Sequence, residues 1–595
     1  MAVELNRTDV VVIGLGAVGG VAVLPLTQAG LEVIGLEAGG WLHPPDFAPD
    51  ELRNNVRGWP YAVQKANREV PVHRRNASAP DSPRRAVHPM MNAVGGTTLH
   101  YWAQSWRLNP WDFKVVSETT RRYGAAWIPA GSTVEDWPFG LEALEPYYDI
   151  VEQEVGISGK AGNIGGVIDE AGNIFEGPRM REYPMPPLRG TEFTDLMGEA
   201  ARRLGWHPFP GPAAINSRPY QDRSACVYHG FCNRGGCHVG AKNSTAVSTI
   251  PKAQETGRLK VVTRAHVTRI QVDRDGRVTG VTYLWNGTEY FQPADVVLLA
   301  SYTYENVRLL LLSTSAPYPN GLSNNGGQVG RHYFSHSQGA GVQALFPHDL
   351  NCWYGLPAQG VAVDNWADDN FDHAGLDFIG GGNLWVFSDR RPISAAGMNT
   401  FGRAPRWGAA WKRFIKENAD RSIGSYLQKT TLPYEDNYLD LDPQVTDPLG
   451  LPVIRITGQF KKNELVIAAF MQRVALTSKS SNTTGQARHT KTVILIGDIF
   501  PAVLTGCRKQ LGNLFLVLAQ DIDAETCRIP GEQRMRCCTM INRKQDQSWL
   551  KRYRGKAVDG DSRFCAVGGT GRNNGHTSCE LAKAVAKITR RERHI

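Results

Sequence analysis

The chain of 595 residues contains no run of 18 or more apolar residues, so it has no segment of the kind that spans a membrane. Its first apolar run, residues 10–13, is not accompanied by the charged start and the cleavage site of a signal peptide. We therefore expect neither a transmembrane segment nor a secretion signal of its own in this chain. Internal repeats and low-complexity segments are also lacking, which excludes a repeat architecture.

The first 500 residues also lack a net charge. The formal net charge of the chain is +9, and residues 501–595 contain 18 Lys and Arg against nine Asp and Glu, so this tail accounts for the whole excess. A basic tail is one feature of nucleic-acid-binding proteins, but here the basic residues are scattered and no nucleic-acid-binding motif accompanies them. The sequence therefore predicts no nucleic-acid partner.

Cysteine is scarce before residue 500, where only four of the ten cysteines lie. Three of these four, Cys226, Cys232 and Cys237, share one glycine-rich segment. Three close cysteines in a large α/β enzyme indicate metal or redox chemistry more than the disulfide framework of a small secreted domain. The alternatives are buried free cysteines or a single disulfide.

The N-terminal segment carries the strongest motif of the chain. An apolar strand at residues 9–13 runs into Gly14, Gly16 and Gly19, which have the G-x-G-x-x-G spacing. In that motif the first glycine permits a tight turn, the second lets a pyrophosphate approach the backbone, and the third lets helix and strand pack closely. A second apolar segment ends at Glu37, where a carboxylate would bind a ribose hydroxyl. The pattern predicts a dinucleotide-binding unit.

The rest of the chain alternates between helical and strand patterns. A second glycine pair, Gly95 and Gly96, is followed by hydroxyl residues and would allow a ligand to approach the backbone. Apolar spacing predicts helices over 140–156, 192–204 and 305–312, and β-branched runs predict strands over 260–263, 266–272, 278–283 and 296–301. The aromatic-rich region 336–460 predicts an antiparallel sheet.

Together, these motifs resemble the glucose–methanol–choline (GMC) flavoprotein oxidoreductases, and their bacterial sugar and polyol dehydrogenase branch more than their secreted oxidases. The resemblance is carried by residues 10–37, 94–107, 224–245, 261–313 and 432–456. These segments occur in the family's order and cover roughly residues 8–465.

The resemblance implies an α/β fold, α+β overall, in which a Rossmann-type FAD-binding domain is joined to a second, antiparallel-sheet substrate domain. The FAD-binding domain is expected over residues 1–335, with surface excursions at 41–90 and 110–220. The substrate-binding domain is expected over 336–495, and residues 496–595 are expected to return to the FAD domain in a divergent form.

The resemblance also implies FAD, rather than NAD, as the cofactor. The residues that it assigns to FAD are Gly14, Gly16, Gly19, Glu37, Gly95, Gly96, Thr97, His100 and Val267. Glu37 would bind the adenosine ribose and Val267 the adenine through its backbone, while the second glycine pair and Thr97 would pack along the flavin-side pyrophosphate. His100 lies where some relatives bond their flavin covalently, and the alternative for it is a plain contact.

In the family branch, the segment that corresponds to Cys226, Cys232 and Cys237 carries a three-cysteine iron–sulfur cluster, with a shorter final gap than the one found here. Electrons leave such an enzyme through the cluster to a haem partner or a quinone. The resemblance therefore allows an iron–sulfur cluster, a cytochrome c subunit and a small export subunit. It leaves open whether the protein is cytoplasmic or reaches the periplasm by export with that partner.

Catalysis in the family depends on a histidine near the C-terminus, which accepts or orients the hydroxyl proton of an alcohol, and on a second His or Asn. Here Arg534 falls on the position of that histidine, and an arginine is no base at neutral pH. His576 and Asn574 are the nearest candidates for the catalytic pair.

The expected activity is FAD-dependent oxidation of the CH–OH group of an alcohol, sugar or polyol, with electrons passed to an external acceptor. The alternatives are a GMC-type oxidase that uses oxygen, or a flavin-binding subunit with reduced or no activity.

Overall fold

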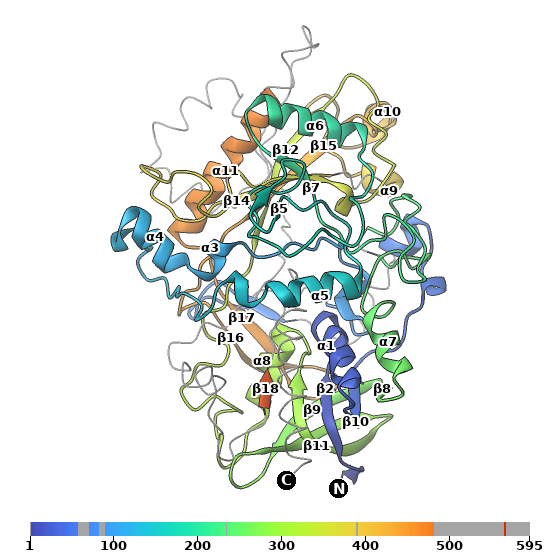
Figure 1. Ribbon diagram of the computed structural model, residues 1–595, viewed down its shortest axis with the longest axis vertical. Helices are drawn as coiled ribbons and strands as arrows, with labels where there is room; N and C mark the ends of the chain where they lie inside the picture. The colour runs from blue at the N-terminus through green and yellow to red at the C-terminus, as the bar shows by residue number, and fades with distance from the viewer. Residues whose placement is uncertain are drawn as a thin grey trace.

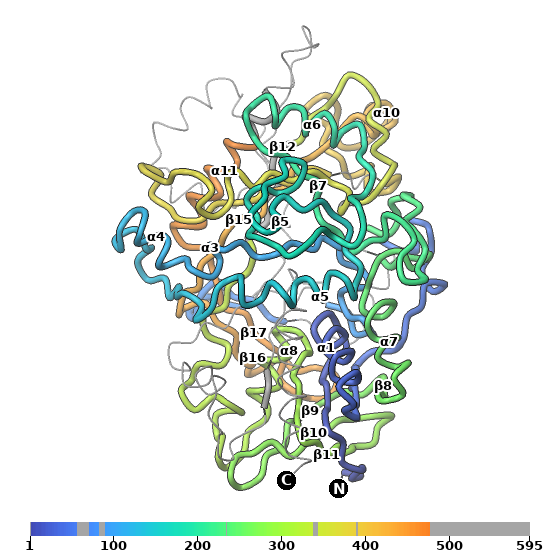
Figure 2. Tube along the Cα trace, in the orientation of Figure 1, coloured from blue at the N-terminus to red at the C-terminus, as the bar shows by residue number. Residues whose placement is uncertain are grey.

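The computed structural model describes residues 2–56, 71–81, 90–233, 235–387, 391–480 and 564–566. Two sheets are stacked along the long axis of the molecule, and helix α5 (Glu145–Val155) crosses between them (Figure 1). The tube view shows that the chain passes between the two halves several times, so each half is built from segments far apart in the sequence (Figure 2).

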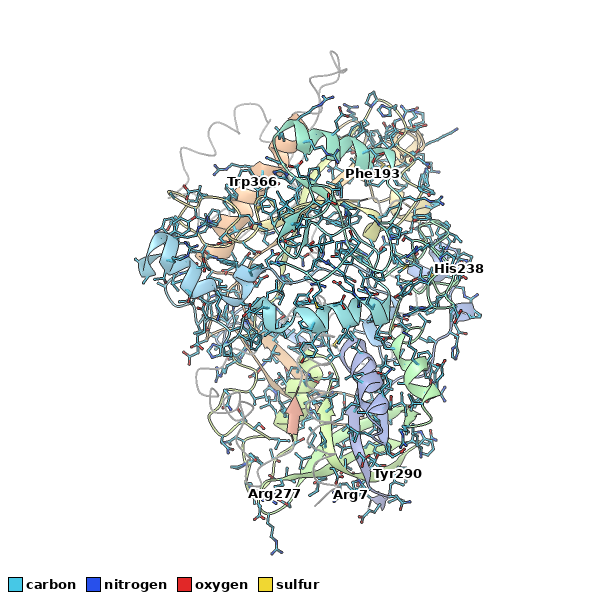
Figure 3. All side chains as sticks on the ribbon, viewed as in Figure 1. Arg7, Phe193, His238, Arg277, Tyr290 and Trp366 are labelled. Carbon is cyan, nitrogen blue, oxygen red and sulfur yellow. The ribbon has the colours of Figure 1, made fainter. Side chains whose placement is uncertain are left out.

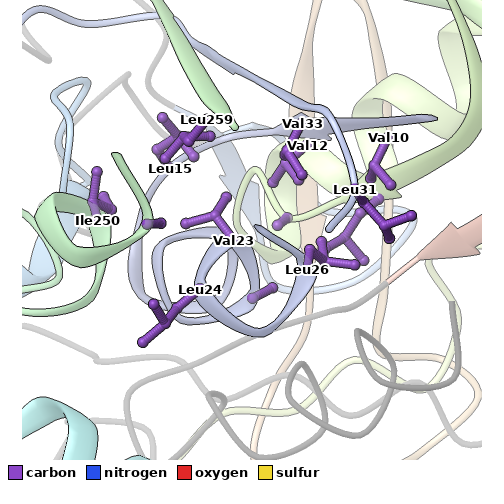
Figure 4. Close-up of a cluster of buried hydrophobic side chains, with 14 of the residues drawn as sticks. Val10, Val12, Leu15, Val23, Leu24, Leu26, Leu31, Val33, Ile250 and Leu259 are labelled. Atoms are coloured by element: carbon purple, nitrogen blue, oxygen red, sulfur yellow. The ribbon is translucent and has the colours of Figure 1, made fainter. Parts of the chain in front are cut away.

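The lower half is built on a parallel sheet with a hairpin extension. Its parallel strands, in order from the edge, are β8 (Leu259–Thr263), β3 (Val33–Glu37), β2 (Thr8–Ile13) and β11 (Thr288–Leu299). All six residues of β2 are buried, which explains its continuous apolar sequence, since both faces of a central parallel strand are covered. Helix α1 (Ala17–Gln28) packs on one face, with Val23, Leu24 and Leu26 in the core that Figure 4 shows.

Strand β11 joins this parallel sheet to an antiparallel meander. Its first half pairs with β10 (Val278–Trp285), which in turn pairs with β9 (Ala265–Val272). Its second half pairs in parallel with β2 and with β18 (Phe564–Ala566), and the short β1 (Val3–Glu4) pairs alongside. Helix α8 (Thr303–Leu312) follows β11, as the sequence pattern predicts.

The upper half is an antiparallel sheet, which confirms the prediction for the aromatic-rich region. Its order is β12 (Ser337–Leu345), β15 (Ser422–Lys429), β14 (Gly382–Phe387), β13 (Val361–Val363) and β7 (Pro208–Pro210). Helices α6 (Glu192–Arg203) and α11 (Lys462–Ser480) cover one face, where Phe193 and Trp366 are labelled in Figure 3. The edge strand β7 comes from ahead of residue 336, and the domain boundaries given above remain predictions.

Shorter elements complete the described fold. A three-stranded sheet consists of β16 (Tyr438–Thr446), β17 (Pro452–Thr457) and β4 (Val72–Arg74), and β5 (Asn163–Ile164) forms a hairpin with β6 (Val167–Ile168). The remaining helices are α3 (Pro110–Phe113), α4 (Val115–Tyr123), α7 (Thr249–Glu255), α9 (Pro392–Ala395) and α10 (Gly408–Asn418). Of the helices in these ranges, none is both long and apolar enough to cross a membrane.

A buried ion-pair network fixes helix α5 between the two halves. Arg107 donates to Glu145 and to Glu152 on α5, each at 2.8 Å, and Arg179 donates to Glu152 at 2.6 Å. The guanidinium of Arg179 also lies 3.7 Å from the ring centre of Tyr183. Because each charge is both desolvated and paired, removal of one partner would leave a buried charge uncompensated.

Candidate functional site

A long cavity lies at the carboxyl ends of the parallel strands, the usual ligand site of an open α/β sheet. Its walls come from the start of α1, the end of β3, the segment 90–105, helix α5 and the start of β9. Six of the residues assigned to FAD by the resemblance line it: Gly14, Gly16, Glu37, Gly96, Thr97 and Val267. The fold thus brings together motifs that are up to 253 positions apart in the sequence.

Two glycines show why the motif tolerates no side chain. A Cβ on Gly19 would lie 1.9 Å from the carbonyl oxygen of Gly14, so α1 could not pack against the turn after β2. A Cβ on Gly96 would lie 2.9 Å from the Cα of Gly16, and Gly96 also has a left-handed φ of +51°. The two glycine segments therefore approach each other backbone to backbone in the wall of the cavity.

The start of helix α1 faces the cavity. Gly16 is its N-cap, no side chain caps the helix, and Gly16, Ala17 and Val18 all line the cavity. The first N–H groups of a helix have no acceptor within it, and with the helix dipole they form an anion site. This donor set fits the pyrophosphate of a dinucleotide.

Glu37 is held at the adenosine end of the cavity by two backbone donors. Leu15 N–H donates to Oε2 at 3.0 Å and Gly39 N–H donates to Oε1 at 2.9 Å. The side chain is buried, and a carboxylate retains lone pairs for further hydrogen bonds. Val267 at the start of β9 lines the same end, so this pair fits a nucleoside.

Three residues assigned to FAD by the resemblance do not line the cavity: Gly19, Gly95 and His100. Gly19 lies behind it, against Gly14. Gly95 is the N-cap of the short 3₁₀ helix Gly96–Leu99, and His100 is the buried residue at its end, with its N–H bonded to the Thr97 carbonyl at 3.2 Å. They shape the cavity wall, and a covalent role for His100 remains a prediction.

Sequence reasoning missed the polar residues that tie the cavity to the cysteine loop. The Thr245 hydroxyl donates to the Gly16 carbonyl at 3.0 Å, and the Thr245 N–H donates to the Thr98 hydroxyl at 3.3 Å. Lys242 is buried and donates to the carbonyls of Tyr101, Cys232 and Gly235 at 2.8–2.9 Å. The Gly-x-Lys-x-Ser-Thr pattern after the cysteines was the available signal.

The cysteine loop holds three thiols that influence one another. Burial, together with the smaller effects of the neighbouring Cys232 and Cys237, raises the pKa of Cys226 to about 12. Burial also raises the pKa of Cys232, against the opposing effect of the Lys242 ammonium. The thiols therefore lie within electrostatic reach of one another. Among the described residues, however, no group of three or more His, Cys, Asp or Glu side chains is gathered closely enough to hold a metal ion.

Buried polar atoms without hydrogen bonds concentrate around this loop. They are Oδ1 of Asn54, Oδ1 of Asn55, both amide atoms of Asn233, and Nη1 of Arg391, whose Nε faces Glu51 at 3.5 Å. Asn54 bonds the carbonyls of Phe231 and Gly236, and Arg391 is close enough to lower the pKa of Cys232. Buried polar atoms are normally paired, so five such atoms around one loop indicate partners from outside the chain, such as water or a bound group.

His576, Asn574 and Arg534 lie outside the described residues, so the structure does not place the predicted catalytic pair. The only described piece of that tail, β18, pairs with β11 beside the parallel sheet.

Comparison with known proteins agrees with this architecture. The sequence profile "GMC oxidoreductase" matches residues 191–338. The chain is 33% identical over 491 residues to the gluconate 2-dehydrogenase flavoprotein of Pantoea cypripedii, covering 79% of each chain. It is 29% identical to the 2-methyl-1,2-propanediol dehydrogenase of Mycolicibacterium austroafricanum, covering 82% of this chain and 84% of that one.

A third relative is the fructose dehydrogenase large subunit of Gluconobacter japonicus, which is 27% identical over 79% of this chain and 83% of its own length. Among solved structures, pyridoxine 4-oxidase from Mesorbium loti aligns with a TM-score of 0.54 over 99% of this chain and 100% of its own, at 13% identity. At that identity the structural match supports the fold alone.

The fold and its cavity are those of a flavin-dependent oxidoreductase. The chain belongs to the GMC oxidoreductase family. Its cofactor is FAD, and it is an enzyme that oxidises the CH–OH group of its substrate, as the sequence analysis predicts.

Proposed function

We propose that this enzyme is a dehydrogenase for a sugar or polyol, and that its electrons leave through the cysteine loop to a partner subunit rather than to oxygen. The observation that carries this proposal is the position of Lys242. Its ammonium bonds at once to Tyr101, which lines the FAD cavity, and to Cys232 and Gly235 in the loop. The buried ammonium of Lys242 therefore connects the wall of the FAD cavity directly to the cysteine loop.

Bound FAD supplies the acceptor for the hydride of the alcohol. The chain would hold this cofactor. The N-terminus of α1 would bind the pyrophosphate, Glu37 would accept hydrogen bonds from the ribose hydroxyls, and the close contact between Gly96 and Gly16 would let the backbone approach the pyrophosphate. Trp102 and Trp106, in the segment that contributes to the cavity wall, pack against Phe387 and Trp385 of the upper sheet. Deprotonation of the alcohol is assigned to the predicted pair in the tail.

The unpaired polar atoms around the cysteine loop support a group bound to the three thiolates. Sulfides of an iron–sulfur cluster accept hydrogen bonds, and such bonds tune the reduction potential. Arg391 and the Asn233 amide are the donors available for this role. The cluster is thus a proposal for the loop, supported by these donors and by the electrostatic proximity of the thiols.

The surface beside the loop suits a partner protein. Leu52, Val227 and Trp353 are large apolar residues that are exposed there, and the segment that contains Leu52 is bonded to the loop through Asn54. Exposed apolar groups gathered in one place are typical of interaction sites. The fructose dehydrogenase relative is by its name a large subunit, which supports an assembly with smaller subunits. A cytochrome c subunit and an export subunit are the proposed partners.

The test is an anaerobic screen of sugars, polyols and simple alcohols that follows bleaching of the flavin, with iron and labile sulfide measured on the same sample. Bleaching by a sugar or polyol, with iron present and without peroxide release in air, is the expected result. Rapid peroxide release would identify an oxidase. A flavin that no compound bleaches would identify a binding subunit without turnover.

The cysteine loop is tested separately with Cys232→Ser, using Cys352→Ser as the matched control. Both cysteines are buried, and the Cys352 thiol bonds the backbone carbonyls of Asp420 and Ser422 in the upper half, outside the loop. We expect Cys232→Ser to lose iron while it keeps FAD, and Cys352→Ser to keep both. If the two variants contain the same amount of iron, the iron is not bound by the cysteine loop.

A further inference from the structure

Helix α10 and the segment before it carry a local excess of positive charge. Residues 403–418, which end with α10, contain five Lys and Arg and one acid, Glu417, although the first 500 residues as a whole are neutral. The excess is therefore a property of this short segment and not of the domain that contains it.

All five cations are exposed, and four of them concern the argument below: Arg406, Lys412, Arg413 and Lys416. Within the described part of the chain, none of the four has an acidic partner or a hydrogen bond. Surface cations elsewhere are commonly paired; Arg421, a few residues further on, bonds Asp349 at 2.7 Å. These four cations are therefore available to bind an anionic group that is not part of this chain.

The helix directs these cations outward because its apolar face is used by the protein. Phe414 is buried in a cluster with Met398 and Phe401, and Ile415 packs against that cluster. Lys412 and Lys416 are one turn apart on the opposite face and project together. These cations thus form a basic face on α10, a helix at the edge of the upper half (Figure 1).

Two large apolar residues are exposed beside this basic face. Trp407, directly before α10, is 79% exposed, the highest value for any large apolar residue that is described. Ile393 on α9 is 43% exposed, and α9 packs in the same cluster as α10 through Ala395. A tryptophan next to lysines and arginines is typical of segments that lie at the membrane–water interface, where the ring enters the headgroup region and the cations bind anionic lipid.

We propose that this surface, formed by Ile393, Arg406, Trp407, Lys412, Arg413 and Lys416 and here called the α9–α10 surface, binds an anionic lipid bilayer. An acidic protein would also satisfy the cations. We favour a bilayer because it needs no shaped pocket to take up the 79% exposed indole of Trp407 beside them. The proposal does not depend on turnover, because attachment is read from binding alone.

The test uses purified holoenzyme and sedimentation with vesicles of phosphatidylcholine alone or with about one-third phosphatidylglycerol. We expect binding to the anionic vesicles only, and loss of most of it between about 0.05 M and about 0.5 M salt, where the screening length falls several-fold. The variant Arg413→Glu/Lys416→Glu should bind at least about 25-fold more weakly, at about five-fold per cation lost. Trp407→Ser should weaken binding with the net charge unchanged.

The matched control is Lys260→Glu/Arg274→Glu, which makes the same change of charge at two exposed residues of the lower half. It should bind like the parent protein, and all variants should keep their FAD content and unfolding temperature. Equal loss in the control would mean a general charge effect and would overturn the proposal. A second result would also overturn the proposal. If the parent protein binds a polyglutamate resin but not the vesicles, and Arg413→Glu/Lys416→Glu abolishes binding to the resin, the surface binds an acidic protein instead.

Discussion

Lys429 is the last residue of β15, and it is 5% exposed. Its stem packs across the sheet against Gly382, on the face that α11 covers with Met471. Within the described residues its ammonium group has neither a hydrogen-bond acceptor nor an acidic partner. Burial alone therefore lowers the pKa of Lys429 from 10.5 to about 8. A solitary buried amine of this kind destabilises the folded state whenever it is charged.

The size of the effect follows from the two pKa values. Their difference of about 2.5 corresponds to about 3 kcal/mol, at about 1.4 kcal/mol for each pH unit. Between about pH 8 and pH 10.5 the unfolded chain binds this proton and the folded chain does not. Stability therefore rises with pH across this window, and the full penalty of Lys429 is present below about pH 8.

Replacement of Lys429 by Met keeps the length of the side chain and removes the charge. We expect Lys429→Met to raise the free energy of unfolding by about 3 kcal/mol at pH 7, and by less as the pH approaches 10. Urea unfolding of the holoenzyme at several pH values measures this, with Lys260→Met as the control at an exposed lysine. A variant no more stable than the parent at pH 7, or one with the same gain at every pH, would refute the assignment of a buried, uncompensated charge.

Three further substitutions test other parts of the fold. Glu37→Gln should retain FAD at least about ten-fold less well, because it loses a charge-assisted bond of about 1.5–3 kcal/mol; the flavin-to-protein absorbance ratio after gel filtration measures this. Gly19→Ala should yield little folded, flavin-bound protein, since its Cβ would overlap a carbonyl oxygen at 1.9 Å, whereas Gly40→Ala, with open space around it, should not. Arg107→Met should cost about 3–5 kcal/mol in urea unfolding because it leaves buried Glu145 without its cationic partner and Glu152 with only Arg179, while Arg121→Met at an exposed ion pair should cost less than about 1 kcal/mol.

The parts of the fold that the sequence predicts are those with local causes. The strand before Gly14 and the helix after it follow from an apolar run and from glycine spacing, and both are present. The helix of α6 follows from its apolar spacing and a capping threonine, Thr191, whose hydroxyl accepts from the N–H of Thr194. In each case, neighbours in sequence determine the conformation.

The parts that were missed have causes distant in sequence. Strand β7 contains two prolines in three residues and is a strand only because β13 pairs with it. The surroundings of the cysteine loop come from Asn54 and Arg391, which no spacing rule connects with residues 226–237. Lys242 lies in the segment 224–245 that carries the resemblance, but its three carbonyl partners depend on how the loop folds back on Tyr101.

Strand β11 has a consequence for how the C-terminal tail must be treated in any engineered form of the enzyme. On one side it is paired by residues 3–13, and on the other by β10 and then by β18, which covers residues 297–299. In a shortened protein without residues 564–566, the backbone amides and carbonyls of the apolar residues 297–299 would be open to pairing with a strand of another molecule. An exposed apolar strand edge pairs readily with strands of other molecules, so we expect the truncated protein to self-associate rather than to behave as a smaller enzyme.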